Sequence, residues 1–235
     1  VQTKDTWIPY GKYDAGELVR LMRSRRSCRN FSDKPVDRDV LEDLVRIGTT
    51  APTGSNAQPW CFTILPDRRA VKMLGEETAQ FLYHLNKLSE KPLARLYARL
   101  VLNDTLGRYH REYHASVSRI LEHWVSGQRD RIFNNAPAAI IVSGRKDATS
   151  SPEDTIFASQ NILLAAHAMG LGSCVIGFAT AALNRTPKIQ RLLGIPDSEK
   201  VHAVIALGRS REPYKRLAGR KKVPIRYYEG GGGAP

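Results

Sequence analysis

The chain has 235 residues, enough for one large domain or two small ones with a substantial core. Its composition, 42% hydrophobic and 25% charged, is ordinary for a globular protein. No apolar run approaches the roughly 18 residues of a membrane span, and no signal-peptide pattern opens the chain, so no membrane partner is expected. Three isolated cysteines without a CxxC pair argue against a disulfide framework, a zinc site or an iron–sulfur cluster, and indicate a reducing cytoplasm.

The formal net charge is +13, and basic residues gather in residues 20–29 and 209–226. One hypothesis is therefore a basic nucleic-acid-binding protein. The alternative is that these cations surround a phosphate and steer anionic partners such as NAD(P)H or an acidic electron-transfer protein. We favour the alternative, because both clusters coincide with the motifs described below.

Hydrophobic periodicity predicts helices that alternate with short apolar strands. After an irregular arm at 1–13, helices are expected at 17–27, 37–48, 67–85, 92–126 (one helix or two), 153–169 and 187–193. Strands are expected at 59–65, 138–143, 174–178 and 201–207. This order predicts an α+β fold, with a central mixed or antiparallel sheet flanked by helices, in a single domain over residues 1–229. The Gly-rich residues 230–235 are expected to form a disordered tail.

Two segments near the N-terminus have the composition of a ligand site. Arg25-Arg-Ser-Cys-Arg-Asn-Phe31 places three arginines and a serine at a predicted helix end, a good place to hold an anion. Ala51-Pro-Thr-Gly-Ser-Asn-Ala-Gln-Pro-Trp60 is a loop that runs into an apolar strand. Its backbone N–H groups and small polar side chains can close around a flat polar ligand.

Two further segments accompany them. Met169-Gly-Leu-Gly-Ser-Cys-Val-Ile-Gly177 contains GxG but lacks the third glycine of a dinucleotide fingerprint, and it leads into a predicted strand, so a Rossmann site is disfavoured. Arg220-Lys-Lys222 is a basic stretch, followed by residues 223–228 with strand character but no partner strand nearby.

Together these segments resemble the signatures of the nitroreductase family of FMN-dependent oxidoreductases, over nearly the whole chain and most weakly at residues 76–135. The resemblance implies a site for FMN, and its candidate residues are Arg25, Arg26, Ser27, Arg29, Pro52, Thr53, Gly54, Ser55, Asn56, Gln58, Val175, Ile176, Gly177, Arg220 and Lys222. It assigns Arg25 to the phosphate and Arg29 to the N1–C2=O edge of the ring. A cation there raises the reduction potential, by roughly 30 mV for each 1.4 kcal/mol of stabilisation in a two-electron couple.

The resemblance also implies a homodimer. Residues 52–58 are expected to reach the flavin of the opposite subunit, and the C-terminal segment is expected to cross over and extend the partner's sheet. Backbone N–H groups of Val175, Ile176 and Gly177 are expected to face flavin N5, and Arg220 with Lys222 to complete the phosphate site.

The implied activity is electron transfer from NAD(P)H, or from a ferredoxin-type donor, through flavin N5 to a small acceptor such as a nitroaromatic, quinone or activated alkene, with ping-pong kinetics. Residues 214–221 resemble the endings of members fused to a ferredoxin-like domain. Together with the start at Val1, this similarity makes an iron–sulfur electron donor a candidate, and whether an upstream segment is missing stays open. Alternatives are a reductive dehalogenase-like member and a flavoprotein that stores or consumes FMN. No catalytic side chain is named.

The weakly matching residues 76–135 are interpreted as a helical insertion that forms a lid over the flavin and selects the substrate. Within it, His110 and His114 are four residues apart on a predicted helix. The metalloprotease motif requires Glu directly after the first histidine and a third ligand, so no metal site is assigned.

Overall fold

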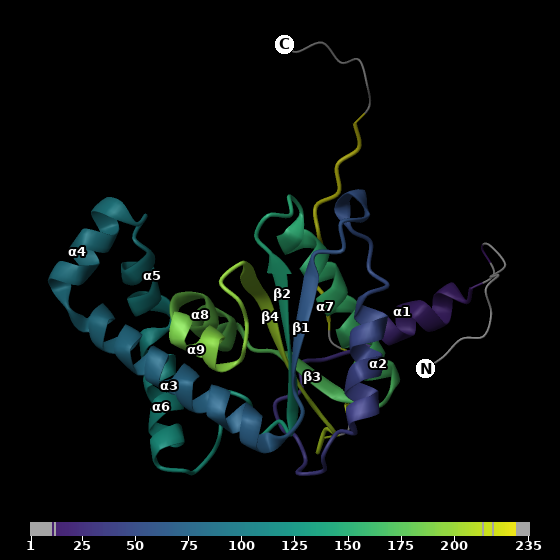
Figure 1. Ribbon diagram of the computed structural model, residues 1–235, viewed down its shortest axis with the longest axis horizontal. Helices are drawn as coiled ribbons and strands as arrows, with labels where there is room; N and C mark the ends of the chain where they lie inside the picture. The colour runs from purple at the N-terminus through teal and green to yellow at the C-terminus, as the bar shows by residue number, and fades with distance from the viewer. Residues whose placement is uncertain (1–10, 12, 213, 218, 229–235) are drawn as a thin grey trace.

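The computed structural model describes residues 11, 13–212, 214–217 and 219–228 (Figure 1). Most of the expected N-terminal arm and all of the expected tail at 230–235 lie outside these residues. The helices are α1 (Ala15–Ser24), α2 (Arg38–Gly48), α3 (Arg68–Glu90), α4 (Pro92–Val101), α5 (Thr105–Glu112), α6 (His114–Val125), α7 (Ser151–Ala168), α8 (Gly177–Arg185) and α9 (Pro187–Leu192). A short 3₁₀ turn, η1 (Gly54–Asn56), precedes the first strand.

The strands β1 (Trp60–Leu65), β2 (Ala138–Arg145), β3 (Gly172–Val175) and β4 (Glu199–Gly208) form one antiparallel sheet in the order β1-β2-β4-β3. Helices cover both faces, with α2 and α7 on one side and α3 and α8 on the other (Figure 1). Because successive strand residues point to opposite faces, Ile140 packs with Leu41 and Ile162, whereas Ile141 packs with Leu74. The predicted α+β fold, a central antiparallel sheet flanked by helices, is confirmed.

Most predicted elements are present with shifted ends. The helix expected at 17–27 stops at Ser24, because Arg25 has extended backbone angles, φ −60° and ψ 131°. The helix expected at 67–85 continues to Glu90. The prediction of one or two helices at 92–126 is wrong: three are present, separated by left-handed residues Asn103 and Asp104 and by Tyr113.

One helix was missed altogether. The strand expected at 174–178 ends at Val175, and Gly177 begins α8. The apolar run before and after Gly177 reads as a strand, but the alanine-rich residues that follow are good helix formers. This change of structure at Gly177 turns the chain sharply at one edge of the sheet.

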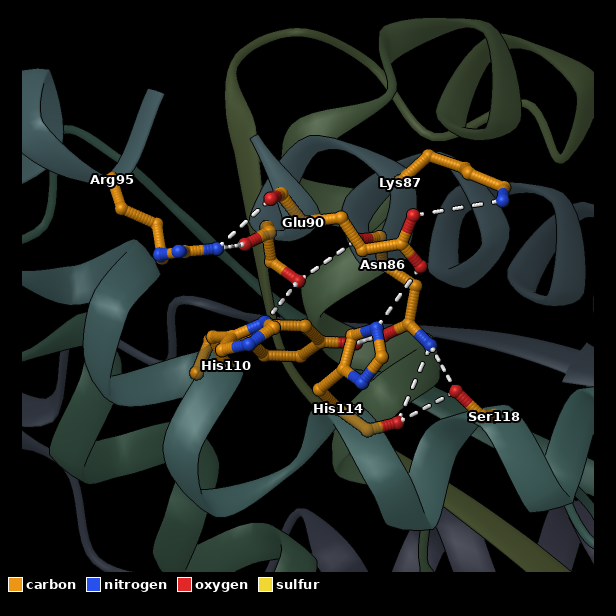
Figure 2. A network of polar contacts seen from close by, with 9 residues as sticks. Asn86, Lys87, Glu90, Arg95, His110, His114 and Ser118 are labelled. Carbon is orange, nitrogen blue, oxygen red and sulfur yellow. Dashed lines mark hydrogen bonds and ion pairs between the residues drawn. The ribbon is translucent and has the colours of Figure 1, made fainter. Parts of the chain in front are cut away.

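Residues 76–135 form a helical extension in which α4 and α5 lie farthest from the sheet (Figure 1). Polar contacts at the junction of its helices surround buried Asn86 of α3 (Figure 2). The Asn86 amide donates to the Ser118 hydroxyl at 3.0 Å and to the His114 carbonyl at 3.3 Å, and its oxygen accepts from the Tyr109 hydroxyl at 2.7 Å. Burial raises the pKa of Tyr109 to about 12, so this hydroxyl remains a donor at neutral pH.

The two histidines of the extension belong to the same junction. His110 contacts the Ser89 hydroxyl at 3.3 Å, and His114 contacts the Glu90 carboxylate at 3.1 Å (Figure 2). The centres of the His110 and His114 rings lie 4.7 Å apart. Arg95, in α4, donates to the carbonyl of Ser89 near the end of α3. These groups therefore join the end of α3 to α4, α5 and α6.

Within the described part of the chain, no helix combines the length and apolar character needed to cross a membrane.

The Asn86 junction gives a stability prediction. Asn86→Ala removes the acceptor of the Tyr109 hydroxyl and one of the donors to the His114 carbonyl, so we expect a loss of about 1–3 kcal/mol in the free energy of unfolding. Urea denaturation followed by circular dichroism measures it. Ser116→Ala removes an exposed contact on α6 and is the matched control, expected to change stability by less than about 0.5 kcal/mol. Equal stability of the two variants would show that the junction does not hold the extension.

Candidate functional site

The arginine-rich segment Arg25–Phe31 lies in extended form along the edge strand β3. Ser27 forms a parallel bridge with Ser173, and the Cys28 N–H donates to the Ser173 carbonyl at 2.9 Å. Farther along, Phe31 bridges to Ser210 just after β4. The first and third predicted motifs are therefore brought together by main-chain pairing.

The approach of the two motifs is close enough to require a glycine. A Cβ on Gly172 would lie 2.8 Å from the Cys28 Cβ and 2.9 Å from its sulfur. Cys28 is itself 1% exposed, so its side chain has no room to move away from a larger residue at position 172. The third motif thus requires glycine at position 172 so that the two segments can pack closely, a role that the sequence prediction did not assign to Gly172.

A cleft of about 450 Å³ opens where Arg29 meets the end of β3 and the start of α8. Val175 is 46% exposed there, and a Cβ built on Gly177 would meet no atom within 4 Å. The Ile176 N–H already donates to the Val204 carbonyl at 2.8 Å, whereas the N–H of Gly177, in the first turn of α8, has no acceptor within the helix. The cleft is lined by Arg29, Tyr113, Arg131, Ile132, Asn134, Cys174, Val175, Ile176, Gly177 and Phe178.

A smaller hollow of about 270 Å³ lies at the other end of the arginine segment and contains Arg25 and Arg26. The Arg26 guanidinium lies 5.1 Å from the centre of the Tyr214 ring. Ser173 also lines the hollow, and its buried hydroxyl has no hydrogen-bond partner among the described residues. A cationic hollow with an unused hydroxyl suits an anion.

His167 and Ser24 close one side of this hollow, with 2.7 Å between the His167 Nε2 and the Ser24 hydroxyl. Burial, assisted by the nearby charge of Arg25, lowers the pKa of His167. His167 lies in the last turn of α7, where the helix dipole favours a cation, so burial and Arg25 outweigh the dipole.

Residues 52–58 form a strained loop. Ser55, Asn56 and Gln58 have positive φ values of 52°, 54° and 45°, which only asparagine among them adopts readily. The Gln58 amide donates to the Asn56 side-chain oxygen at 2.8 Å, and the Gly54 N–H donates to the Asp154 carboxylate at 3.1 Å. Such strain at a surface loop is typical of binding sites.

This loop is not brought to the arginine segment of the same chain. Gly54 is anchored to Asp154 at the start of α7, whereas Ser24 is bonded to His167 near its end. The two anchors, Asp154 and His167, are thirteen residue steps apart along α7, which corresponds to about 20 Å. The two motifs are therefore anchored at opposite ends of α7.

Arg220 and Lys222 are exposed and extended. Within the described residues, the one hydrogen bond of the Arg220 side chain goes to the adjacent Gly219 carbonyl, at 3.4 Å. Val223, Ile225 and Tyr227 are 72%, 70% and 82% exposed, and no strand forms over the described part of this tail. In the single chain these residues take no part in either hollow.

Six lining residues of the larger cleft were not among the predicted site residues: Tyr113, Arg131, Ile132, Asn134, Cys174 and Phe178. Tyr113 lies between α5 and α6, and Arg131 and Asn134 lie in the loop before β2. The Asn134-Asn135 pair, with φ of 55° and 61°, was a visible signal of a tight loop, but nothing in the sequence placed it beside Gly177.

Two of the three cysteines, Cys61 and Cys174, do not offer a nucleophile. Burial raises the pKa of Cys174 and, with help from the neighbouring Glu199, raises that of Cys61 to about 11. Both thiols therefore remain protonated near neutral pH.

Residues 22–209 match the model of the nitroreductase family, so the chain belongs to that family and is an enzyme of its oxidoreductase class. An Archaeoglobus fulgidus protein named as an NADH dehydrogenase/NAD(P)H nitroreductase is 25% identical over 82% of this chain and 84% of its own length. The iodotyrosine deiodinase of Danio rerio is 25% identical over 86% of this chain, which spans 65% of that longer protein. An FMN-bound nitroreductase from Desulfitobacterium hafniense superimposes with a TM-score of 0.66 at 23% identity, covering 91% of this chain and 98% of the other.

The lowered pKa of His167 predicts a pH dependence of stability. The unfolded chain binds a proton at His167 more readily than the folded one, so this residue destabilises the fold as the pH falls through about 6.5. We expect the loss of stability between pH 7.5 and pH 5.5 to be smaller in His167→Gln than in the wild type, measured by urea denaturation. Exposed His84→Gln is the matched control. An unchanged loss in His167→Gln would contradict the assignment.

Proposed function

We propose that the protein is an FMN-dependent oxidoreductase. The observation that carries the proposal is that one extended segment lines both hollows, with Arg25 and Arg26 in the smaller one and Arg29 in the larger one. From Arg25 to Arg29 such a segment spans about 13 Å. This arrangement suits a ligand whose charged end and flat ring are joined by a short flexible chain, as in FMN.

The donor set fits this cofactor. Arg25 and Ser27 would hold the phosphate, Arg29 would face the pyrimidine edge of the ring, and the open N–H of Gly177 would face N5. The side chain of Val175 offers an exposed apolar surface for the ring. FMN, when bound, supplies the redox chemistry, and the chain's own groups bind it, orient it and stabilise its reduced, negatively charged form.

We propose further that the site forms only in a homodimer. Residues 52–58 lie about 20 Å from the arginine segment along α7, so the contacts expected from Gly54, Ser55 and Asn56 must come from a second copy. Exposed apolar side chains on α1 and α7 could form the interface. About half of the surface of each of these side chains is exposed: Leu18, Val19 and Met22 on α1, and Ile156 and Phe157 on α7.

The C-terminal segment is proposed to reach the partner subunit. Val223, Ile225 and Tyr227 occupy alternate positions, as on one face of a strand, and all three are exposed in the single chain. Pairing with the partner's sheet would satisfy the backbone of this segment and bring Arg220 and Lys222 to a phosphate.

The proposed reaction takes two electrons from NAD(P)H, or from a ferredoxin-type donor, and delivers them to a small organic acceptor in the cytoplasm. For a nitro group, two electrons and two protons give a nitroso group and one water. The cationic cleft favours an anionic donor. The likeness to a deiodinase favours reductive dehalogenation as the second candidate reaction. Storage of FMN without turnover is the outcome if no acceptor is reduced.

The phosphate assignment predicts the effect of Arg25→Ala. Loss of a charge-assisted contact to a phosphate corresponds to about a ten- to hundredfold weaker Kd for FMN. Flavin absorbance after dialysis against graded FMN measures it. Arg23→Ala, which removes an exposed arginine two residues earlier, is the matched control and should bind FMN like the wild type. If Arg25→Ala also binds FMN normally, Arg25 does not hold the phosphate.

The shared site predicts complementation between subunits. Ser55→Glu places a carboxylate in the loop at residues 52–58, and we expect it to prevent FMN binding. Arg25→Ala, in the other motif, is expected to weaken FMN binding. A heterodimer of the two variants, isolated through two affinity tags, has one site with both defects and one site with none. It should therefore hold about half the FMN of the wild type. FMN content as low as in either variant homodimer would mean that both motifs serve the same subunit's site.

Arg29 is predicted to tune the potential. Arg29→Gln removes a positive charge from the pyrimidine edge, so the bound flavin should be harder to reduce, by about 30 mV for each 1.4 kcal/mol of lost stabilisation. Spectroelectrochemical titration of the holoprotein measures the midpoint. An unchanged or raised midpoint would place Arg29 away from the ring.

A further inference from the structure

The larger cleft carries an excess of positive charge. Its lining includes two guanidinium groups, from Arg29 and Arg131, and no carboxylate. The remaining lining side chains are neutral, and the cleft has the size of an ordinary small-molecule site. A neutral acceptor would leave this charge unmatched once the flavin is in place.

Arg131 is the guanidinium that the proposed FMN site does not use. It takes part in none of the ion pairs formed by the residues that the structure describes, and it is exposed. Its neighbour Arg129, in contrast, donates to the Arg29 carbonyl at 3.3 Å and so ties this loop to the arginine segment.

The backbone on either side of Arg131 is fixed. The Asp130 carboxylate accepts hydrogen bonds from the N–H groups of Ile132 and Phe133 at 2.8 Å and of Asn135 at 2.9 Å. Ile132 and Phe133 are 2% and 1% exposed. The loop therefore holds the Cα of Arg131 in place and leaves its side chain free to meet a ligand in the cleft.

An aromatic surface lies at the same cleft. Tyr113 is 47% exposed and lines it, and its ring stacks on that of Tyr109, with centres 6.1 Å apart. Tyr109 is in turn held by Asn86. The cleft thus combines a fixed aromatic ring with the guanidinium of Arg131, which the proposed FMN site does not use.

We propose that Arg131 selects a small aromatic acceptor that carries a carboxylate. The inference rests on the proposed function, because it assigns Arg29 to the flavin and leaves Arg131 for the second molecule. A planar guanidinium matches a monoanionic carboxylate in a bidentate pair, whereas a dianionic phosphate recruits several cations. Tyr113 contacts the ring of the acceptor while Arg131 holds its carboxylate.

The test compares 4-nitrobenzoate with 4-nitrobenzamide, which differ in charge but share the ring and the nitro group. In the FMN-loaded dimer, Arg131→Gln should lower kcat/KM for 4-nitrobenzoate about ten- to hundredfold and change that for 4-nitrobenzamide by less than about twofold. Arg131→Lys should retain part of the preference. Arg69→Gln, which removes an exposed arginine at the start of α3, is the matched control and should leave both values unchanged.

Binding without turnover gives a second readout. Calorimetry with benzoate and benzamide should show that Arg131→Gln weakens benzoate alone. Equal losses for both nitro compounds, or none, would overturn the inference while the reductase activity stands. A loss confined to flavin reduction by NADPH would reassign Arg131 to the donor's phosphate. Failure of the FMN-loaded wild type to reduce any acceptor would instead count against the proposed function, and the binding comparison would then decide the inference alone.

Discussion

The arginine segment is held against the end of the sheet by main-chain pairing at two points, and the candidate site depends on this contact. Ser27 pairs with Ser173 on β3, and Phe31 pairs with Ser210 beyond β4. Between these points the segment runs so close to β3 that a Cβ at position 172 would overlap the side chain of Cys28. The cations are therefore positioned by backbone hydrogen bonds, which do not depend on what the side chains bind.

The sheet also separates the second motif, the loop at residues 52–58, from the arginine segment. The loop at residues 52–58 leads into Trp60, which lies in register with the Lys200 end of β4, whereas Ser173 pairs with Leu207 near the other end. Seven strand residues separate these positions, or about 23 Å. In a dimer whose two copies meet end to end, the strained loop of one copy could lie beside the cationic segment of the other. The half-exposed apolar side chains of α1 and α7 then become buried.

Local sequence patterns predicted most of the helices and strands of this architecture. The spacing of Arg25, Ser27 and Arg29 predicted a group of cofactor-binding residues within a few positions of one another. Arg25 lines the smaller hollow and Arg29 the larger cleft, whereas Ser27 lines neither. The lining of the cleft by Arg131 could not be read from the chain, since it depends on a loop that Asp130 folds back toward β3. The start of α8 was missed for a related reason: an apolar run suits a strand or a buried helix equally until its neighbours are known.

Charge sets a limit on how such a dimer can assemble. Each chain carries a formal excess of +13, so two chains repel one another, and the repulsion grows as salt is removed. Apolar burial must provide the attraction, while bound anions relieve the repulsion at the two clefts. A phosphate in the smaller hollow neutralises charge close to Arg25 and Arg26, and an anionic acceptor does so close to Arg131. In the proposed dimer, cofactor binding and dimer stability would therefore be coupled, because any anion that requires both subunits would stabilise the pair by its own binding free energy.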